Sequence, residues 1–104
     1  MNLNITHTQG INLNRGDLTG ADLNGTNLQG ADLSNCNLED VNFEGADLRG
    51  ANLQDSNLRG ANLRGADLRG ATIHNAYFHA IQYDDDTQWP ITPTKHNQSI
   101  FNNY

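Results

Sequence analysis

The sequence predicts an all-β solenoid, a chain of short extended segments that coil around one axis and stack on each other. The first observation is a large apolar residue at every fifth position over residues 11–85, through fifteen consecutive units. The second is a small residue two places before most of these, and the third is a glycine that often closes the unit. Self-similarity at a short fixed period is typical of repeat architectures.

Each five-residue unit, called a pentad here, has the same order of side chains. A small residue comes first, then Asn or Asp, then the large residue and two closing residues, as in 46–50 and 66–70. We predict that every large side chain points inward. The large residues are Leu13, Leu18, Leu23, Leu28, Leu33, Leu38, Phe43, Leu48, Leu53, Leu58, Leu63, Leu68, Ile73, Phe78 and Tyr83.

A period of five fits neither a helix nor a flat strand. In a helix, five residues advance about 500°, so the large residues would spiral around the cylinder. In a strand, side chains alternate with period two, so every second large residue would face away from the core. Both difficulties disappear if the chain turns a corner once per pentad. Glycine suits such a corner because it readily adopts a positive φ, and an outward Asn or Asp can bond to nearby backbone.

The A-(D/N)-L-x-x pattern of these residues resembles the pentapeptide-repeat proteins. The resemblance covers residues 11–85 and implies a right-handed quadrilateral parallel β-helix with four pentads per coil, which gives about four coils. Residues twenty apart would then stack about 4.8 Å apart along the axis.

A coil of twenty residues also predicts how outward charges meet. Arg49 stacks on Arg69 as a like-charge pair, and aspartates on the same face are within reach of both. Surface pairs contribute only about 0–1 kcal/mol each, so the columns of large residues must hold the stack together. The expected opposite-charge pairs are Glu39 with Arg59 and Glu44 with Arg64.

We predict three segments: residues 1–10 as an N-terminal cap or degenerate repeat, 11–85 as the coils, and 86–104 as a C-terminal cap and tail. Caps are expected because the open ends of a solenoid expose apolar surface. Trp89, the single tryptophan, is expected to cover the last coil. The segment 87–90 resembles the exit segment of many small cyanobacterial members of the family, which implies a bacterial, cyanobacterial source.

The charge and composition exclude several classes of protein. The formal net charge is -6, whereas a protein that binds nucleic acid directly needs a basic face. Met1 is followed by neither a basic start nor an apolar run, so we expect no signal peptide, no membrane span and a cytoplasmic location. One cysteine allows no internal disulfide.

The sequence contains no convincing catalytic, cofactor or metal site. His74 and His79 are two potential ligands where a metal needs three or four, and Asp84–Asp86 lacks the spaced ligands of a calcium loop. Cys36 occupies a small inward position and is interpreted as a core residue. Nucleophile elbows and nucleotide-binding loops do not occur. We therefore predict that the chain is not an enzyme and has no cofactor.

The remaining function is that of a rigid, monomeric scaffold that binds another protein. A rigid face loses little conformational entropy on binding. The rod is acidic over residues 11–45 and nearly neutral over 46–70, an asymmetry that orients a charged partner. An equally good interpretation is that these charges only keep the protein soluble. The candidate partner-binding residues are Arg49, Arg59, Arg64, Arg69, Phe101 and Tyr104.

The resemblance also implies an alternative function, because some pentapeptide-repeat proteins mimic DNA and protect DNA gyrase from quinolones. Those members are generally longer and dimerise through a C-terminal helical segment. Four coils give roughly 20 Å of rod, which corresponds to about six base pairs at roughly 3.4 Å each. Pro90 and Pro93 also argue against a helical dimer element in this chain.

Overall fold

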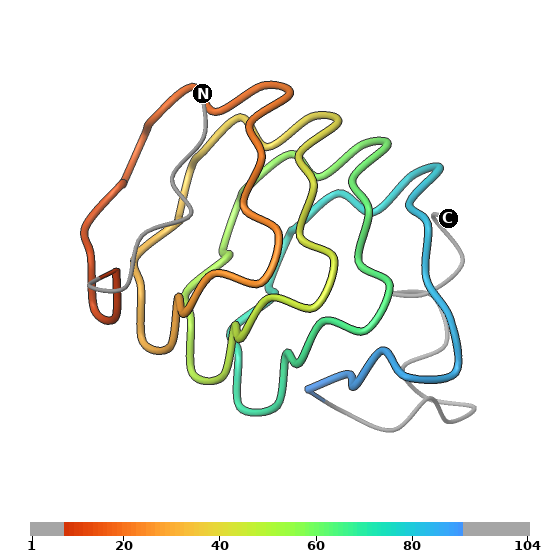
Figure 1. Ribbon diagram of the computed structural model, residues 1–104. Coiled ribbons are helices and arrows are strands. Elements are labelled where there is room, and N and C mark those ends of the chain that lie inside the picture. The colour runs from red at the N-terminus through yellow and green to blue at the C-terminus, as the bar shows by residue number, and fades with distance from the viewer. Residues whose placement is uncertain (1–7, 91–104) are drawn as a thin grey trace.

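The computed structural model describes residues 8–90 of the chain. Over this range the backbone forms coils that stack side by side along one axis, from the first described residues at one end to the last at the other (Figure 1). Residues 8–90 form neither helix nor extended strand, so this part of the chain has no helix that crosses a membrane. Isolated parallel bridges join the coils, because only the residue between the two inward side chains pairs before the chain turns again.

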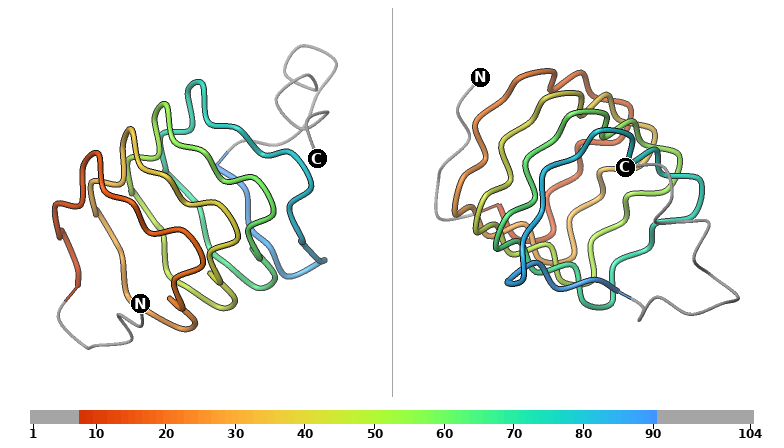
Figure 2. Two further views of the ribbon diagram at one scale, coloured as in Figure 1. Left: turned by 90° about the horizontal axis from the view of Figure 1, so that it is seen from above. Right: turned by 90° about the vertical axis from the view of Figure 1, so that its right-hand side faces the viewer.

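The bridges define the coil and confirm the predicted period of twenty residues. There are twelve parallel bridges among the described residues. Eleven of them connect residues twenty apart, and the last joins Asp67 to Gln88. Four pentads therefore complete one coil, and successive coils lie one behind the other around a common axis (Figure 2). The bridge residues are Asn12, Asp32, Asn52 and Thr72 on the first side, Asp17, Asn37, Asn57 and Tyr77 on the second, Asp22, Asn42, Asn62 and Gln82 on the third, and Asn27, Asp47, Asp67 and Gln88 on the fourth.

The corner of each pentad has one fixed backbone conformation. Every fifth residue from Gly10 to Ala80 has a positive φ, between 56° and 75°. In most corners the next residue donates its N–H to the carbonyl three positions earlier, as Ala51 does to Leu48 at 3.0 Å. This is the geometry of a type II turn, whose third residue requires a positive φ. Glycine fills nine of these fifteen positions, which is the role predicted for it.

The outward Asn or Asp stabilises the corner that follows it. In twelve successive pentads, from Asn12 to Asp67, its side-chain oxygen accepts the backbone N–H two residues later at 3.0–3.1 Å. A turn leaves such donors without a partner in the backbone ladder, and these short polar side chains supply one. The predicted outward orientation and backbone bond are therefore confirmed.

The core consists of the two inward positions of each pentad. Large residues such as Leu33 and Leu48, and small ones such as Ala51, have no exposed surface. Tyr83 also occupies a large position, but it is 48% exposed. Tyr83 lies in the last coil of residues 8–90, so no further coil of this range covers it. Leu13 in the first coil is likewise only partly buried.

The stack includes residues on either side of 11–85. Thr8 is buried, and its hydroxyl donates to the carbonyl of Asn27 in the next coil. At the other end the ladder continues to Gln88. The corner at Asp84–Asp86 contains one extra residue, which raises the spacing of the last bridge from 20 to 21 and so hides this segment from a search for period five.

Trp89 covers the last coil, as predicted. It takes the large position of the final segment and packs against the core. Its ring lies edge-on to those of Phe78 and Tyr83, with ring centroids 6.0 Å apart in both pairs. Such edge-to-face pairs are favourable beyond the apolar area that they bury. Phe78, Tyr83 and Trp89 thus provide apolar packing in the last described coil, as the leucine columns do inside the rod.

Candidate partner-binding surface

Each side of the rod ends in a corner whose exposed side chains form a row along the axis. The residue after the large one lies at this corner, and its carbonyl accepts the N–H of the corner residue one coil earlier. Arg49 accepts in this way from Gly30 at 2.8 Å, and Arg69 accepts from Gly50 at 3.0 Å. The backbone bonds between coils therefore fix the register of the side chains in each row.

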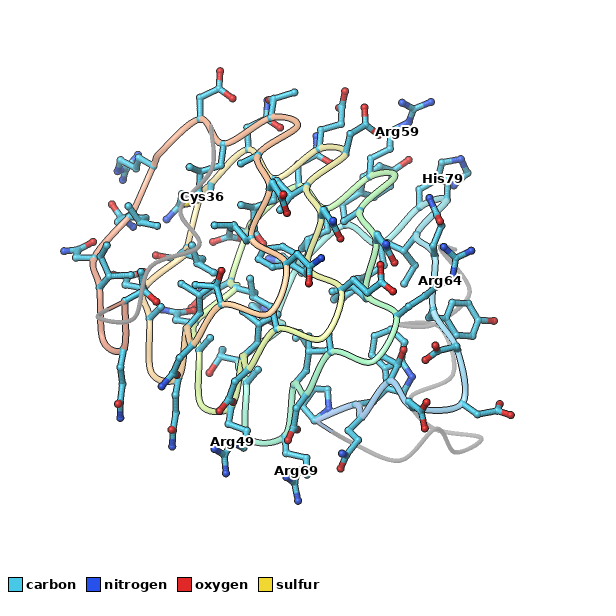
Figure 3. All side chains as sticks on the ribbon, viewed as in Figure 1. Cys36, Arg49, Arg59, Arg64, Arg69 and His79 are labelled. Atoms are coloured by element: carbon cyan, nitrogen blue, oxygen red, sulfur yellow. The ribbon has the colours of Figure 1, made fainter. Side chains whose placement is uncertain are left out.

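The corner after the fourth side carries Gln9, Gln29, Arg49 and Arg69, which we call the arginine edge. Arg49 and Arg69 extend in the same direction from the rod (Figure 3). Arg49 donates from Nε and Nη2 to the carboxylate of Asp47 at 2.9 and 2.7 Å. Arg69 makes the same two contacts to Asp67, at 2.9 and 2.6 Å. The paired bonds hold both guanidinium groups in place, although their side chains are 45% and 58% exposed.

The two pairs also interact across coils. Nε of Arg49 lies 4.0 Å from Oδ2 of Asp67. The hydrogen bonds from Arg49 hold the pKa of Asp47 below its ordinary value, and those from Arg69 lower the pKa of Asp67. Both carboxylates are therefore ionised at neutral pH. The stacking of Arg49 on Arg69, with aspartates beside both, is confirmed.

Arg59 and Arg64 lie at other corners, away from the arginine edge (Figure 3). The predicted ion pairs of Arg59 with Glu39 and of Arg64 with Glu44 are wrong, because every ion pair between residues 8 and 90 belongs to the arginine edge. The guanidinium of Arg64 donates from Nη1 to Oε1 of Gln82 at 2.5 Å instead. An exposed ion pair is worth little, so a neutral acceptor on the next coil competes with it.

The two glutamates bond to amides on the following coil. Oε1 of Glu39 accepts from Nδ2 of Asn57 at 3.3 Å, and Oε2 of Glu44 accepts from Nδ2 of Asn62 at 3.4 Å. These asparagines are the bridge residues of the arginine-containing pentads 56–60 and 61–65. The amides therefore occupy the glutamates that the arginines were expected to bind.

The residue two places before each arginine distinguishes the two pairs of arginines in the sequence. Arg49 and Arg69 follow Asp47 and Asp67 by two places, whereas the same position before Arg59 and Arg64 is asparagine. Residues two apart across the large position lie on the same side of the rod. An aspartate there binds the arginine of its own pentad, and an asparagine does not.

The remaining candidates lie apart from the four arginines in the sequence. Phe101 and Tyr104 lie outside the described residues. Cys36 is buried, its Sγ contacts the carbonyl oxygen of Leu13 at 2.9 Å, and burial raises the pKa of its thiol. It is a core residue, as predicted. Between residues 8 and 90 no three histidine, cysteine or acidic residues come together as metal ligands.

Tyr77 is an exposed aromatic residue that was not among the predicted site residues. Tyr77 is 43% exposed and stacks on the ring of His79, with ring centroids 5.8 Å apart. The available signal was its position, because Tyr77 occupies the outward bridge position that is Asn or Asp in most earlier pentads. It lies in the last coil, beyond the coils that carry the arginine edge.

Coils of four pentads, with a positive-φ corner and an outward Asn or Asp in most pentads, define a β-helical class of repeat proteins. The family model for pentapeptide repeats matches residues 9–40 and 46–79 of this chain. The match covers more than half of the sequence. The chain belongs to the pentapeptide repeat family.

Solved structures of cyanobacterial pentapeptide repeat proteins are similar to this chain. HetL from Nostoc sp. strain PCC 7120, a protein involved in heterocyst differentiation regulation, is 34% identical with a TM-score of 0.70, over 71% of this chain and 35% of HetL. Rfr23 from Cyanothece 51142 is 35% identical with a TM-score of 0.50, over 78% of this chain and 62% of Rfr23. The chain thus spans only part of either protein. These similarities agree with the predicted cyanobacterial source.

The fold extends to a plant protein. A pentapeptide repeat protein from the Arabidopsis thaliana thylakoid lumen is 23% identical with a TM-score of 0.63, over 93% of this chain and 88% of that protein. At this identity the likeness concerns the fold alone. No curated protein sequence matches this chain.

Proposed function

We propose that this chain is a non-enzymatic, monomeric scaffold that binds a partner protein along the arginine edge. In this proposal its coils wind as the right-handed quadrilateral β-helix that the family resemblance implies. The observation that carries the proposal is the pair of ordered guanidinium groups of Arg49 and Arg69, each bonded twice to its own aspartate and one coil apart. Side chains that are already fixed lose less entropy when a partner binds.

The backbone under the arginine edge supports the same function. On the fourth side, the N–H of Leu48 donates to the carbonyl of Asp67 at 2.7 Å, and the N–H of Asp47 donates to the carbonyl of Thr26 at 3.0 Å. Bonds of this kind recur in every described coil and restrict the movement of one coil relative to the next. A partner therefore meets a surface whose geometry is already set before binding.

Capture from the native lysate with matched variants tests the proposal. The R49Q/R69Q and R59Q/R64Q variants lose the same charge, but only the first alters the arginine edge. We expect the wild-type chain and R59Q/R64Q to retain one common protein, and R49Q/R69Q to lose it. Equal loss in both variants, or in neither, would contradict the proposal. Loss only on deletion of residues 92–104 would assign binding to Phe101 and Tyr104 instead.

Gyrase mimicry is the alternative function, and an activity assay separates it from the scaffold. The acidic excess of the described residues lies on the first three sides and their corners, whereas the two arginines balance the two aspartates at the fourth side. A duplex mimic would slow supercoiling by gyrase at micromolar concentration. We expect no such inhibition from this short rod.

A further inference from the structure

We infer that the arginine edge binds the carboxylate groups of an acidic polypeptide segment that lies along the rod axis. This inference rests on the proposed function and specifies the chemistry of the partner. Three properties carry it: the carboxylates beside the two arginines are already engaged, the arginine donors are partly available, and this is the side of the rod without net charge.

The carboxylates beside Arg49 and Arg69 are already engaged within the protein. Oδ1 of Asp47 accepts the backbone N–H of Arg49 and its Nε–H, and Oδ2 accepts from Nη2. Oδ1 of Asp67 accepts the same two groups from Arg69, and Oδ2 accepts from Nε and Nη2. A partner that donates hydrogen bonds therefore finds few accessible acceptors on these carboxylates.

The donors of the edge are only partly used. A guanidinium group has five N–H donors, and the bonds of Arg49 and Arg69 engage Nε and Nη2. Within residues 8–90, Nη1 of neither arginine makes a hydrogen bond, whereas Arg64 uses its Nη1 to bind Gln82. The free side of each guanidinium is a planar fork that matches a carboxylate. The edge therefore selects a ligand that supplies acceptors.

The charge distribution favours an acidic partner at this edge over every other part of the rod. The first three sides and their corners carry the whole negative excess of residues 8–90, because Asp47 and Asp67 balance Arg49 and Arg69 at the fourth side. An acidic segment is repelled from those three sides and is accepted at the fourth. Duplex DNA presents a wide, dense row of phosphates, so the same repulsion acts on it more strongly.

The spacing of the two arginines suits an extended chain. Stacked coils place Arg49 and Arg69 about 4.8 Å apart at their backbones, and an extended peptide presents alternate side chains about 6.7 Å apart. Glutamate side chains are long enough to bridge this difference. A segment with Glu at alternate positions therefore reaches both forks from one face.

Nuclear magnetic resonance with a defined peptide tests the inference. The probe is a peptide of alternating Glu and Ser, and the control peptide has Gln in place of Glu. We expect the Nε–H signals of Arg49 and Arg69 to shift saturably with the Glu peptide, and less as salt is added. The R49Q/R69Q variant should weaken binding about tenfold, and R59Q/R64Q should leave it unchanged. Circular dichroism of both variants verifies that they remain folded.

Three results would overturn the inference. These are equal shifts with the Gln peptide, equal shifts at Arg59 and Arg64, or shifts of the same signals by a short DNA duplex at lower concentration. If the Glu peptide leaves the edge unaffected while capture from the lysate still depends on Arg49 and Arg69, the partner is not acidic and the proposed function stands. If capture is also independent of these arginines, both proposals fail.

Discussion

The middle coils and the last coil follow the same pentad order but differ in what stabilises them. In the middle coils the outward Asn or Asp bonds to the following corner, and glycine fills most corners. In the last coil, Thr72, Tyr77 and Gln82 replace that acceptor, and Ala80 adopts a φ of 59° without being glycine. The parallel bridges continue all the same. Stacking on the previous coil therefore sets the backbone, and the local bonds refine it.

The largest expected effect comes from a charge in the middle of the core. Leu48 is fully buried, so Leu48→Asp should cost several kcal/mol, because it places a carboxylate where no partner solvates it. Tyr83→Asp changes a large position on another side of the last described coil, which is half exposed, and should cost much less. Urea denaturation followed by circular dichroism measures both. Cooperative unfolding of Leu48→Asp at wild-type stability would refute the inward assignment.

The second effect tests how closely the coils pack at the small position. Ala51 has no exposed surface, so Ala51→Leu should overpack the coil and lower the free energy of unfolding by about 1–3 kcal/mol. Ala76→Leu makes the same change in the last described coil, where Ala76 is 9% exposed. We expect a smaller loss there. Equal losses at both positions would mean that the last coil is packed as tightly as the middle.

The third effect concerns the corners. A Cβ on Gly50 would meet no atom closer than 4.0 Å, so Gly50→Ala tests the positive φ alone. We expect it to lower the free energy of unfolding by about 0.5–1 kcal/mol, and Ala80→Gly to raise it by about the same amount. Thermal denaturation of the two variants measures the difference. Stabilisation by Gly50→Ala would contradict the role assigned to the corner.

The smallest effect is the dependence of stability on pH. The pKa values of Asp47 and Asp67 are lower in the folded protein than in the unfolded chain, because Arg49 and Arg69 bind the carboxylates. This contribution is complete above the unfolded value of about 3.9 and is lost as the pH falls through the folded value. Between about pH 5 and about pH 2, the D47N/D67N variant should therefore lose less stability than the wild type. Denaturant titrations across this range provide the test, and identical pH profiles would show that the pairs are not stabilising.

The sequence predicted the fold to the extent that burial determines it. A period of five admits few backbone solutions, so the corners and the inward columns followed from the large residues, whereas the twenty-residue stacking followed from the resemblance to the family. The exposure of Tyr83 did not follow, because burial of an inward residue depends on whether another coil comes after it. The bridge formed by Gln88 did not follow from the period either, because the extra residue at Asp84–Asp86 interrupts it.

The candidate site was predicted only in part. The stacking of Arg49 on Arg69 follows from the coil length alone. The partners of Arg59 and Arg64 do not, because exposed charges have several alternatives of nearly equal energy. In the structure, Glu39 and Glu44 accept hydrogen bonds from asparagine amides, and Arg64 donates to Gln82. The choice of Asp or Asn two residues before each arginine would have separated the two pairs of arginines.

The wider corner at Asp84–Asp86 shows where this architecture tolerates a change in length. One additional residue enters there, and Gln88 still forms its bridge to Asp67. An insertion within one side of a coil would instead turn the inward side chains of that segment outward. The corner is therefore a suitable position for grafting a foreign loop, such as an epitope tag, that projects from the rod while the walls keep their alignment.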